Sequence, residues 1–288
     1  MTSQPPPRII RGLDELRAIT RAWKRAGETI GVVPTMGALH DGHLSLARAA
    51  RQNCDRVIVT IFVNPKQFNN PEDLENYPRT EDDDARKLAP IGVDLIWVPD
   101  GEQMYPSDFA TNVSVSGITD VMEGAHRPGH FDGVATVVAK LFLQTAADQA
   151  FFGEKDFQQL MIVTRMAKDL DIDIEVIGCP TVREDTGLAM SSRNLLLSDR
   201  AMMKAATLHE VMTDTVAALA EGAEFSTLQD AAKARLRAAD FTEIEYFEIR
   251  ARDDFAPLTT PTRPARLFAA AWMAGVRLID NIDVPVKG

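Results

Sequence analysis

The sequence predicts an α/β protein, in which a doubly wound parallel sheet is followed by a second, smaller α+β domain. Residues 56–63 form a nearly continuous β-branched apolar run, which is typical of a strand buried on both faces of a parallel sheet. Another apolar run covers residues 30–33, and the helical pattern between the two predicts a strand–helix–strand unit. After about residue 182 the pattern changes to long helices and separate strands.

The elements of the first domain, which we expect to be Rossmann-like and to span residues 1–181, follow from apolar spacing. Period-3.6 stripes predict helices, and β-branched runs predict strands. A stop signal at Gly27 ends the first helix. We expect helices over residues 12–26, 44–53, 134–144 and 157–170, and one that begins near Glu81. We expect strands over residues 30–33, 56–63, 93–98, 112–115 and 172–177.

The second domain is expected over residues 182–288. Ser198 is a typical capping residue for one long helix over residues 199–221, which Gly222 would end. A second helix is expected over residues 225–239. The strands that complete this domain are expected over residues 244–249, 266–272 and 276–281.

Composition limits the possible partners and compartment. A formal net charge of −11 over 288 residues, without clustered Lys and Arg, argues against a nucleic-acid partner, because clustered cations hold phosphate backbones. No apolar run reaches membrane-spanning length, and the proline-rich residues 1–7, which we expect to be disordered, lack a signal core. Cys54 and Cys179 are too few for a disulfide framework and predict buried free thiols. We therefore expect a cytoplasmic protein without a membrane partner.

One stretch, residues 32–44, organises the predicted site. It begins as a strand, breaks at Pro34 and Gly37, and resumes as a helix at Leu44. The first N–H groups of a helix and its dipole favour an anion, and glycine lets a phosphate approach the backbone. His40 and His43 are three residues apart, so one turn brings both imidazoles to the same side, where they could stabilise charge on a phosphoryl group. The alternatives are two surface histidines or part of a metal site.

The residues around this stretch resemble a known family. His40-Asp41-Gly42-His43 resembles the H-x-G-H signature of the nucleotidylyl-transferring superfamily, and residues 34–43 together resemble the pantothenate synthetase family. Four later motifs resemble the same family in the same order: residues 64–68, 123–134, 153–159 and 183–194. The resemblance is dense over residues 30–197 and loose beyond. Within residues 183–194, Ala189 departs from the first lysine of the superfamily's mobile loop, and Arg193 replaces the second.

The resemblance implies roles for individual residues. It implies catalytic roles for His40, His43, Lys155, Ser191, Ser192 and Arg193. It implies ATP contacts for Pro34, Thr35, Met36, Gly37, His40, His43, Gly153, Lys155, Asp156, Val182, Met190, Ser191, Ser192 and Arg193. It implies contacts to pantoate or β-alanine for Asn64, Gln67, Glu123 and Gln159, and the charge of Arg127 makes it a further candidate for substrate binding as an anion contact, with a solvated surface charge as the alternative. It also places Asp83 and Asp84 near Mg²⁺, although carboxylates in the first turn of a helix are common for electrostatic reasons alone.

The activity implied is an ATP-dependent, AMP-forming ligation of pantoate and β-alanine through a pantoyl adenylate, with Mg²⁺ present and the protein a homodimer. No serine or cysteine lies in a triad-like context, so the attacking group should come from the substrate. The second domain would cover the nucleotide cleft. Two alternatives stay open: a nucleotidylyltransferase that retains the nucleotide on its product, and a non-catalytic nucleotide-binding regulator. His126 and His130 lack a third ligand at usable spacing and are expected to be structural.

Overall fold

The computed structural model describes residues 6–69 and 71–286, and the chain divides into two compact units, Met1–Pro180 and Thr181–Gly288. The division lies beside the boundary expected from the sequence. Residues 1–5 of the proline-rich start, for which disorder was expected, lie outside the described residues.

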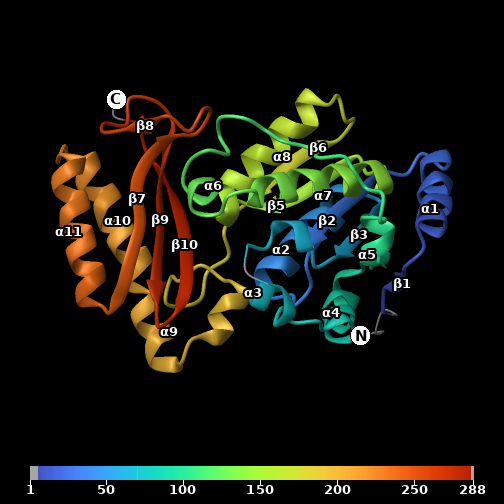
Figure 1. Ribbon diagram of the computed structural model, residues 1–288, viewed down its shortest axis with the longest axis horizontal. Helices are drawn as coiled ribbons and strands as arrows, with labels where there is room; N and C mark the ends of the chain where they lie inside the picture. Colours follow the sequence, from blue (N-terminus) through green and yellow to red (C-terminus); the bar gives the residue numbers. More distant parts are fainter. Residues whose placement is uncertain (1–5, 70, 287–288) are drawn as a thin grey trace. The chain divides into compact units, whose positions relative to one another are not determined.

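The first unit contains a six-stranded parallel sheet in the order β1-β4-β3-β2-β5-β6 (Figure 1). Its strands are β1 (Arg8–Ile10), β2 (Ile30–Thr35), β3 (Arg56–Ile61), β4 (Leu95–Trp97), β5 (Gln149–Gly153) and β6 (Glu175–Cys179). From β2 the chain winds first towards β3 and β4 and then returns to β5 and β6. The fold is therefore doubly wound, as predicted, and a crevice is expected at the carboxyl ends of β2 and β5, where the direction reverses.

Helices cover both faces of this sheet. The main ones are α1 (Leu13–Arg25), α2 (Asp41–Asn53), α4 (Glu81–Leu88), α7 (His130–Thr145) and α8 (Phe157–Asp169), with short helices α3 (Pro71–Glu75), α5 (Gly101–Met104) and α6 (Glu123–His126) between them. The apolar residues of α2 and α4 pack on alternate residues of the strands, such as Val57 and Val59. On the opposite face α7 packs against both α1 and α8, with α7 and α8 side by side (Figure 1). Phe142 of α7 contacts Phe152 of β5 there, with 6.2 Å between ring centroids.

Two predicted boundaries around the histidine motif are wrong. β2 continues through Pro34, which pairs in register with Thr60 of β3. On its other side, β2 pairs with β5 only at Gly31 and Val32. Pro34 lies beyond these paired positions, so the N–H that proline lacks is not needed for pairing with β5. α2 begins at Asp41, three residues earlier than the apolar stripe indicated, because its capping residues are polar.

Two further differences in the first unit arise from contacts distant in sequence, whereas α7, which begins at His130, and β6, Glu175–Cys179, differ from expectation only in their bounds. The strand expected over residues 112–115 is absent, and side chains of α7 hold this segment instead: Val113 N–H donates to Thr136 Oγ1, and Ser114 Oγ donates to Asp132. β1 was not predicted, because its three residues acquire strand geometry from pairing with β4.

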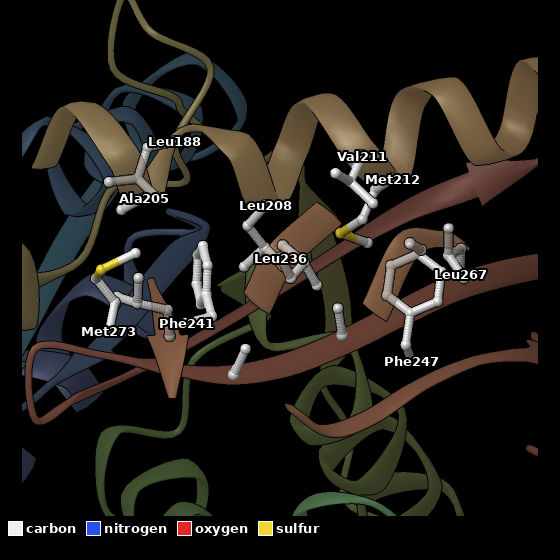
Figure 2. Close-up of a cluster of buried hydrophobic side chains, with 14 of the residues drawn as sticks. Leu188, Ala205, Leu208, Val211, Met212, Leu236, Phe241, Phe247, Leu267 and Met273 are labelled. Carbon is white, nitrogen blue, oxygen red and sulfur yellow. The ribbon is translucent and has the colours of Figure 1, made fainter. Parts of the chain in front are cut away.

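The second unit is an antiparallel sheet covered by helices. Its helices are α9 (Asp199–Ala205), α10 (Thr207–Ala220) and α11 (Phe225–Ala238), and its strands are β7 (Phe241–Ala251), β8 (Pro257–Leu258), β9 (Ala265–Met273) and β10 (Val276–Val284), in the sheet order β10-β9-β7-β8. Figure 2 shows side chains of α10, such as Leu208 and Met212, gathered with Leu236 of α11 and Phe247 of β7 in the core. The single helix expected over residues 199–221 is interrupted at Ala206, whose carbonyl accepts from His209 N–H in a tighter turn.

Cys54 and Cys179 are free and buried, as predicted. Burial raises the pKa of the Cys54 thiol to about 11. Among the described residues, no helix is both long enough and apolar enough to cross a membrane.

Candidate active site at the carboxyl ends of β2 and β5

Two turns in the first unit carry residues predicted to contact phosphate. Residues 36–40 follow β2, and Glu154–Asp156 follow β5. Because β2 and β5 are parallel neighbours, both turns leave the same edge of the sheet. The charge of Lys155 lowers the pKa of both His40 and His43, so the ammonium lies within electrostatic range of the two imidazoles. The structure therefore brings these three predicted residues together.

The two histidines cap α2 reciprocally. Gly42 N–H donates to His40 Nδ1 over 3.2 Å, and His40 N–H donates to His43 Nδ1 over 3.4 Å. A ring nitrogen that accepts a hydrogen bond carries no proton, so each neutral imidazole is protonated on Nε2. A Cβ at Gly42 would lie 2.8 Å from His40 Cε1, so glycine is required for the His40 ring to close over the helix start. The cap thus explains the glycine of the motif and selects one tautomer of both rings.

Both rings are held in the neutral form. Burial, followed by the charge of Lys155, lowers the pKa of His40. Burial, followed by His40 and Lys155, lowers the pKa of His43 to about 3. The ring centroids lie 4.1 Å apart, so a proton on one ring would disfavour a proton on the other. At neutral pH the pair consists of two neutral Nε2–H donors within electrostatic range of the Lys155 ammonium.

The turn before the cap is fixed by hydrogen bonds to polar side chains. Thr35 Oγ1 donates to the carbonyl of Thr60 and accepts from Gly37 N–H. The carboxylate of Asp84, which is completely buried, accepts from the N–H groups of Ala38 and Leu39 over 3.0 and 2.8 Å. These two N–H groups, which precede α2, are therefore committed to a protein carboxylate.

The predicted metal residues differ in environment. Asp84 uses both oxygens inside the protein, whereas Asp83 is exposed and pairs with Arg86 on the same helix. Over the described residues, no group of three or more His, Cys, Asp and Glu side chains is placed to hold a metal ion. The pair does not fit a site in which both carboxylates bind one metal, and a metal role for Asp83 and Asp84 stays a prediction.

The loop after β3 forms the second part of the site. Asn64 is buried, and its amide makes four hydrogen bonds: it donates to Gln67 Oε1 and the Gly133 carbonyl, and accepts from Lys66 N–H and Tyr105 Oη–H. These bonds use both amide protons and both oxygen lone pairs. Asn64 therefore orients Gln67, and a direct contact of Asn64 with substrate stays a prediction.

Gln67 also connects this loop to the histidine turn and to α7. Its Nε2 lies 3.1 Å from Met36 Sδ, and its carbonyl accepts from His130 Nδ1 over 2.8 Å and from Arg127 Nη2 over 3.3 Å. Because a carbonyl only accepts, His130 carries its proton on Nδ1, and Nε2 then accepts from Arg127 over 3.1 Å. Burial and the Arg127 charge lower the pKa of His130 to about 4. This confirms the structural role predicted for His130.

Glu123 and Arg127 form an ion pair, with 3.6 Å between Oε2 and Nη1. Adjacent glutamines at the start of α8 have different roles. Gln158 is buried and holds residues 118–123 through bonds to Ile118, Val121 and Glu123, whereas Gln159 is partly buried and carries the predicted pantoate contact. Asn64, Gln67, Glu123 and Arg127 thus belong to one hydrogen-bonded region, while the contact of Gln159 stays a prediction.

Lys155 and Asp156 lie on the turn that leads into α8. The side chain of Lys155 is partly buried, with Nζ 3.7 Å from Asp156 Oδ1. Asp156 occupies the N-cap position of α8, but its side chain makes no capping hydrogen bond, and the residue is exposed. Gly153 ends β5 directly before this turn. An exposed carboxylate without a capping bond is compatible with the predicted ribose contact.

The motif at residues 183–194 lies in the second unit. Met190 N–H donates to the Val182 carbonyl, so these two of the predicted ATP contacts are paired through their backbones. Ser191 caps the short 3₁₀ helix Ser192–Leu196 by accepting from Arg193 N–H, and Ser192 is partly buried. The loop is internally ordered, and its contact with ATP stays a prediction.

A cavity of about 340 Å³ adjoins the histidine turn in the first unit. It is lined by Met36 and Gly37, by Arg79, Thr80 and Glu81, and by apolar residues at the ends of β3 and β4. His40, His43 and Lys155 are not among its lining residues. The cavity therefore lies next to the histidine turn, towards β3 and β4.

Sequence reasoning missed Tyr105, Thr80 and Lys87, which help to hold the site in place. Tyr105 bonds to Asn64 across 41 positions of sequence, and no local pattern indicated this contact. A weak signal existed for Thr80 and Asp84, whose spacing of four places them on one helical face, and Thr80 Oγ1 donates to Asp84 over 3.2 Å. Lys87, one turn further along α4, donates to the Leu39 carbonyl over 2.6 Å.

Comparison with known proteins extends the similarity beyond the motifs. The sequence pattern of the pantoate-beta-alanine ligase family matches residues 8–283. Pantothenate synthetase of Roseobacter denitrificans is 67% identical over 278 residues, covering 96% of this chain and 98% of that protein.

Two solved structures also match across both units. Pantothenate synthetase from Thermus thermophilus has a TM-score of 0.90 and 43% identity, covering 96% of this chain and 99% of that one. Pantoate-beta-alanine ligase from Francisella tularensis, complexed with beta-gamma ATP and beta-alanine, has a TM-score of 0.82 and 34% identity, covering 96% and 97%.

Proposed function

This chain belongs to the pantoate-beta-alanine ligase family, and from that premise we propose that it is an AMP-forming ligase that condenses pantoate with β-alanine to pantothenate. The observation that carries the proposal is the pair of neutral Nε2–H imidazoles at the start of α2, within electrostatic range of Lys155. Two donors and one cation at the crevice of a doubly wound sheet suit the α-phosphate of ATP. The alternative, a nucleotidylyltransferase that keeps the nucleotide on its product, is not favoured by membership of this family.

In the first step, a pantoate carboxylate oxygen attacks the α-phosphorus of ATP. The bond from that phosphorus to the bridging oxygen breaks, and pyrophosphate leaves with the electron pair. His40 and His43 donate from Nε2 to oxygens that gain charge, and Lys155 offsets the charge without a proton transfer. Gln67 and Gln159 orient pantoate, with Gln67 held by Asn64.

In the second step, the amine of β-alanine attacks the acyl carbon of pantoyl adenylate. The carbon–oxygen bond to phosphate breaks, AMP leaves, and the amine loses a proton; no residue is assigned as the acceptor of that proton. The Glu123–Arg127 pair lies beside the carbonyl of Gln67 and supplies opposite charges that suit a zwitterionic amino acid. Exclusion of water protects the mixed anhydride, and covering the cleft is the role we assign to the second unit with Ser191, Ser192 and Arg193.

Three further properties belong to the proposal. Mg²⁺ accompanies ATP as its counter-ion and would be held largely by phosphate oxygens and water, because Asp83 and Asp84 do not form a two-carboxylate site. The protein acts in the cytoplasm, where its buried cysteines stay reduced. It assembles as a homodimer, as the family resemblance implies.

Exchange of labelled pyrophosphate into ATP tests the function. We expect exchange that requires pantoate, and a second assay should show AMP and pantothenate only when β-alanine is added. His43→Ala should abolish exchange with an unchanged circular dichroism spectrum, whereas Lys168→Met, in the last turn of α8, should exchange normally. Exchange without pantoate would favour the nucleotidylyltransferase, and binding of ATP without any exchange would favour a regulator.

A further inference from the structure

The turn between β2 and α2 is clamped by a separate element, α4. Asp84 Oδ2 accepts from Ala38 N–H, and Oδ1 accepts from Leu39 N–H. Lys87, which is also on α4, donates from Nζ to the carbonyl of Leu39. Helix α4 therefore binds both the donor and the acceptor of Leu39, the residue directly before His40.

The backbone of this turn has an unfavourable conformation that the clamp stabilises. Gly37 and Ala38 both have positive φ, +85° and +52°. A left-handed conformation is easy for glycine and costly for alanine, because the Cβ approaches the carbonyl oxygen. Successive N–H groups in such a turn converge into a concavity that binds anions, and here the anion is the buried Asp84 carboxylate. Without that anion, Ala38 would relax and the position of His40 would change.

We propose that Asp84 is a positioning residue: its carboxylate fixes residues 37–39 and thereby holds His40 at the N-cap of α2, where the reciprocal cap sets the tautomer of both imidazoles. The proposal replaces the predicted metal role of Asp84, because the side chain is completely buried and each oxygen accepts from the protein. The expected effect on rate rests on the proposed ligase function, whereas the effect on the tautomers does not.

Asp84→Asn tests the proposal with little change in shape. The amide would present an N–H group to a backbone N–H group, replacing a hydrogen bond by a repulsion. We expect kcat of pantoate-dependent exchange to fall roughly tenfold to a hundredfold, because displaced groups lose transition-state stabilisation, with a much smaller change in the KM for ATP. Asp82→Asn, on an exposed position of the same helix turn, is the matched control and should leave kcat unchanged.

A second readout separates positioning from general stability. In the wild type, ¹⁵N chemical shifts of the imidazoles should report the Nε2–H form for His40 and His43. In Asp84→Asn they should report a mixture of tautomers, while the melting temperature shows that the protein is folded. Ala38→Gly in the Asp84→Asn background should recover part of kcat, since glycine adopts the left-handed conformation without the Cβ contact.

If Asp84→Asn does not fold, Thr80→Val tests the same anchor with a smaller perturbation. It removes the 3.2 Å bond to Asp84 Oδ2 and should lower kcat in the same direction by a smaller factor. Unchanged kcat and unchanged imidazole shifts in the folded variant would overturn the proposal. So would recovery of the lost activity at high Mg²⁺ concentration, which would indicate a metal role. Wild-type protein without exchange activity, but with tautomers that depend on Asp84, would refute the proposed function and leave the positioning intact.

Discussion

Two loops that carry predicted site residues are each anchored by one buried carboxylate, but by different chemistry. In the first unit, Asp84 accepts from successive backbone N–H groups of the histidine turn. In the second unit, Asp280 is bound by the guanidinium of Arg183 over 2.6 and 2.9 Å, and His209 Nδ1 lies 3.5 Å from it. Arg183 also donates to the Gly187 carbonyl, so Asp280 holds the loop that leads to Ser191.

The difference predicts which kind of substitution should destabilise each loop. An anchor made by backbone N–H groups depends on the φ angles of the turn and cannot be lost by neutralising a cation. The anchor made by the Arg183 guanidinium depends on its positive charge, which compensates the buried Asp280 carboxylate. Burial acts to raise the pKa of Asp280, but the nearby His209 ring and the hydrogen bonds from Arg183 outweigh it, so the pKa lies below its ordinary value.

The largest effect is expected from Arg183→Met, which leaves the Asp280 carboxylate buried without its main partner. Breaking a buried pair by removing one member costs about 3 kcal/mol or more, and urea unfolding of the purified protein measures it. Arg263→Met removes a guanidinium from an exposed pair with Asp253 and Asp254 and is the control, with no resolvable change. Equal decreases in the free energy of unfolding in the two variants would mean that the buried Arg183–Asp280 pair contributes no more to stability than the exposed pair.

Gly187→Ala should have the next largest effect. Gly187 has φ +89°, and a Cβ there would lie 2.7 Å from His209 Cδ2. Gly275 has a similar φ of +79° with no atom within 4 Å of that position, so Gly275→Ala isolates the cost of the left-handed backbone, about 1–2 kcal/mol. We expect Gly187→Ala to unfold at lower urea than Gly275→Ala, because displaced His209 moves away from Asp280. Identical midpoints would contradict the proposed contribution of His209.

Acid should weaken the two units in different pH ranges. The folded pKa of His43, about 3, lies below the unfolded value of about 6.5, so the unfolded state binds more protons between these values and stability falls as the pH falls through them. His130, at about 4, acts in the same direction. The lowered pKa of Asp280 keeps its stabilising contribution until the pH falls below the ordinary aspartate range.

Hydrogen exchange followed by peptide mass spectrometry between pH 7 and pH 3.5 measures both responses. Peptides of the first unit should lose protection earlier on acidification than peptides of β9 and β10. Replacement of His130 by Gln should reduce the acid sensitivity of the first unit. Simultaneous loss of protection in both units would contradict the separate origins argued for the two anchors.

The smallest effect is a pKa change in the histidine pair. Lys155→Met removes a positive charge that lowers the pKa of His40 and His43, so both values should rise in NMR titrations. Lys168→Met, at the last turn of α8, removes the same charge at the other end of the helix and should change neither value. Unchanged titration of His40 in Lys155→Met would show that the ammonium does not share the crevice with the imidazoles.

The local pattern predicted most of the architecture. Three features of the sequence were enough to predict a doubly wound sheet and an α+β domain. They are the β-branched run that forms β3, the motif at the start of α2, and the change to long helices and separate strands after residue 182. The boundaries were less accurate, because Pro34 and Asp41 take their conformation from pairing and capping rather than from hydrophobic spacing.

The site divides in the same way. Sequence alone identified His40, His43 and Lys155 as candidates, since their residue types and the strand-to-helix turns are local features. The family resemblance placed Asp84 near a metal, and the acidic run could not decide its role, because such a run at a helix start looks the same whether it binds a cation or a backbone turn. The backbone N–H groups that Asp84 accepts from lie 45 and 46 positions away in sequence.

What the sequence determined by itself is the set of elements and the chemical groups on the turns between them, because hydrophobic periodicity and turn residues act over a few positions. The protonated nitrogen of each imidazole, the neutral state of the pair and the anchors at Asp84 and Asp280 were decided only by the tertiary structure. Burial and hydrogen-bond geometry come from segments far apart in the chain, and no local pattern records which buried carboxylate will meet which backbone N–H.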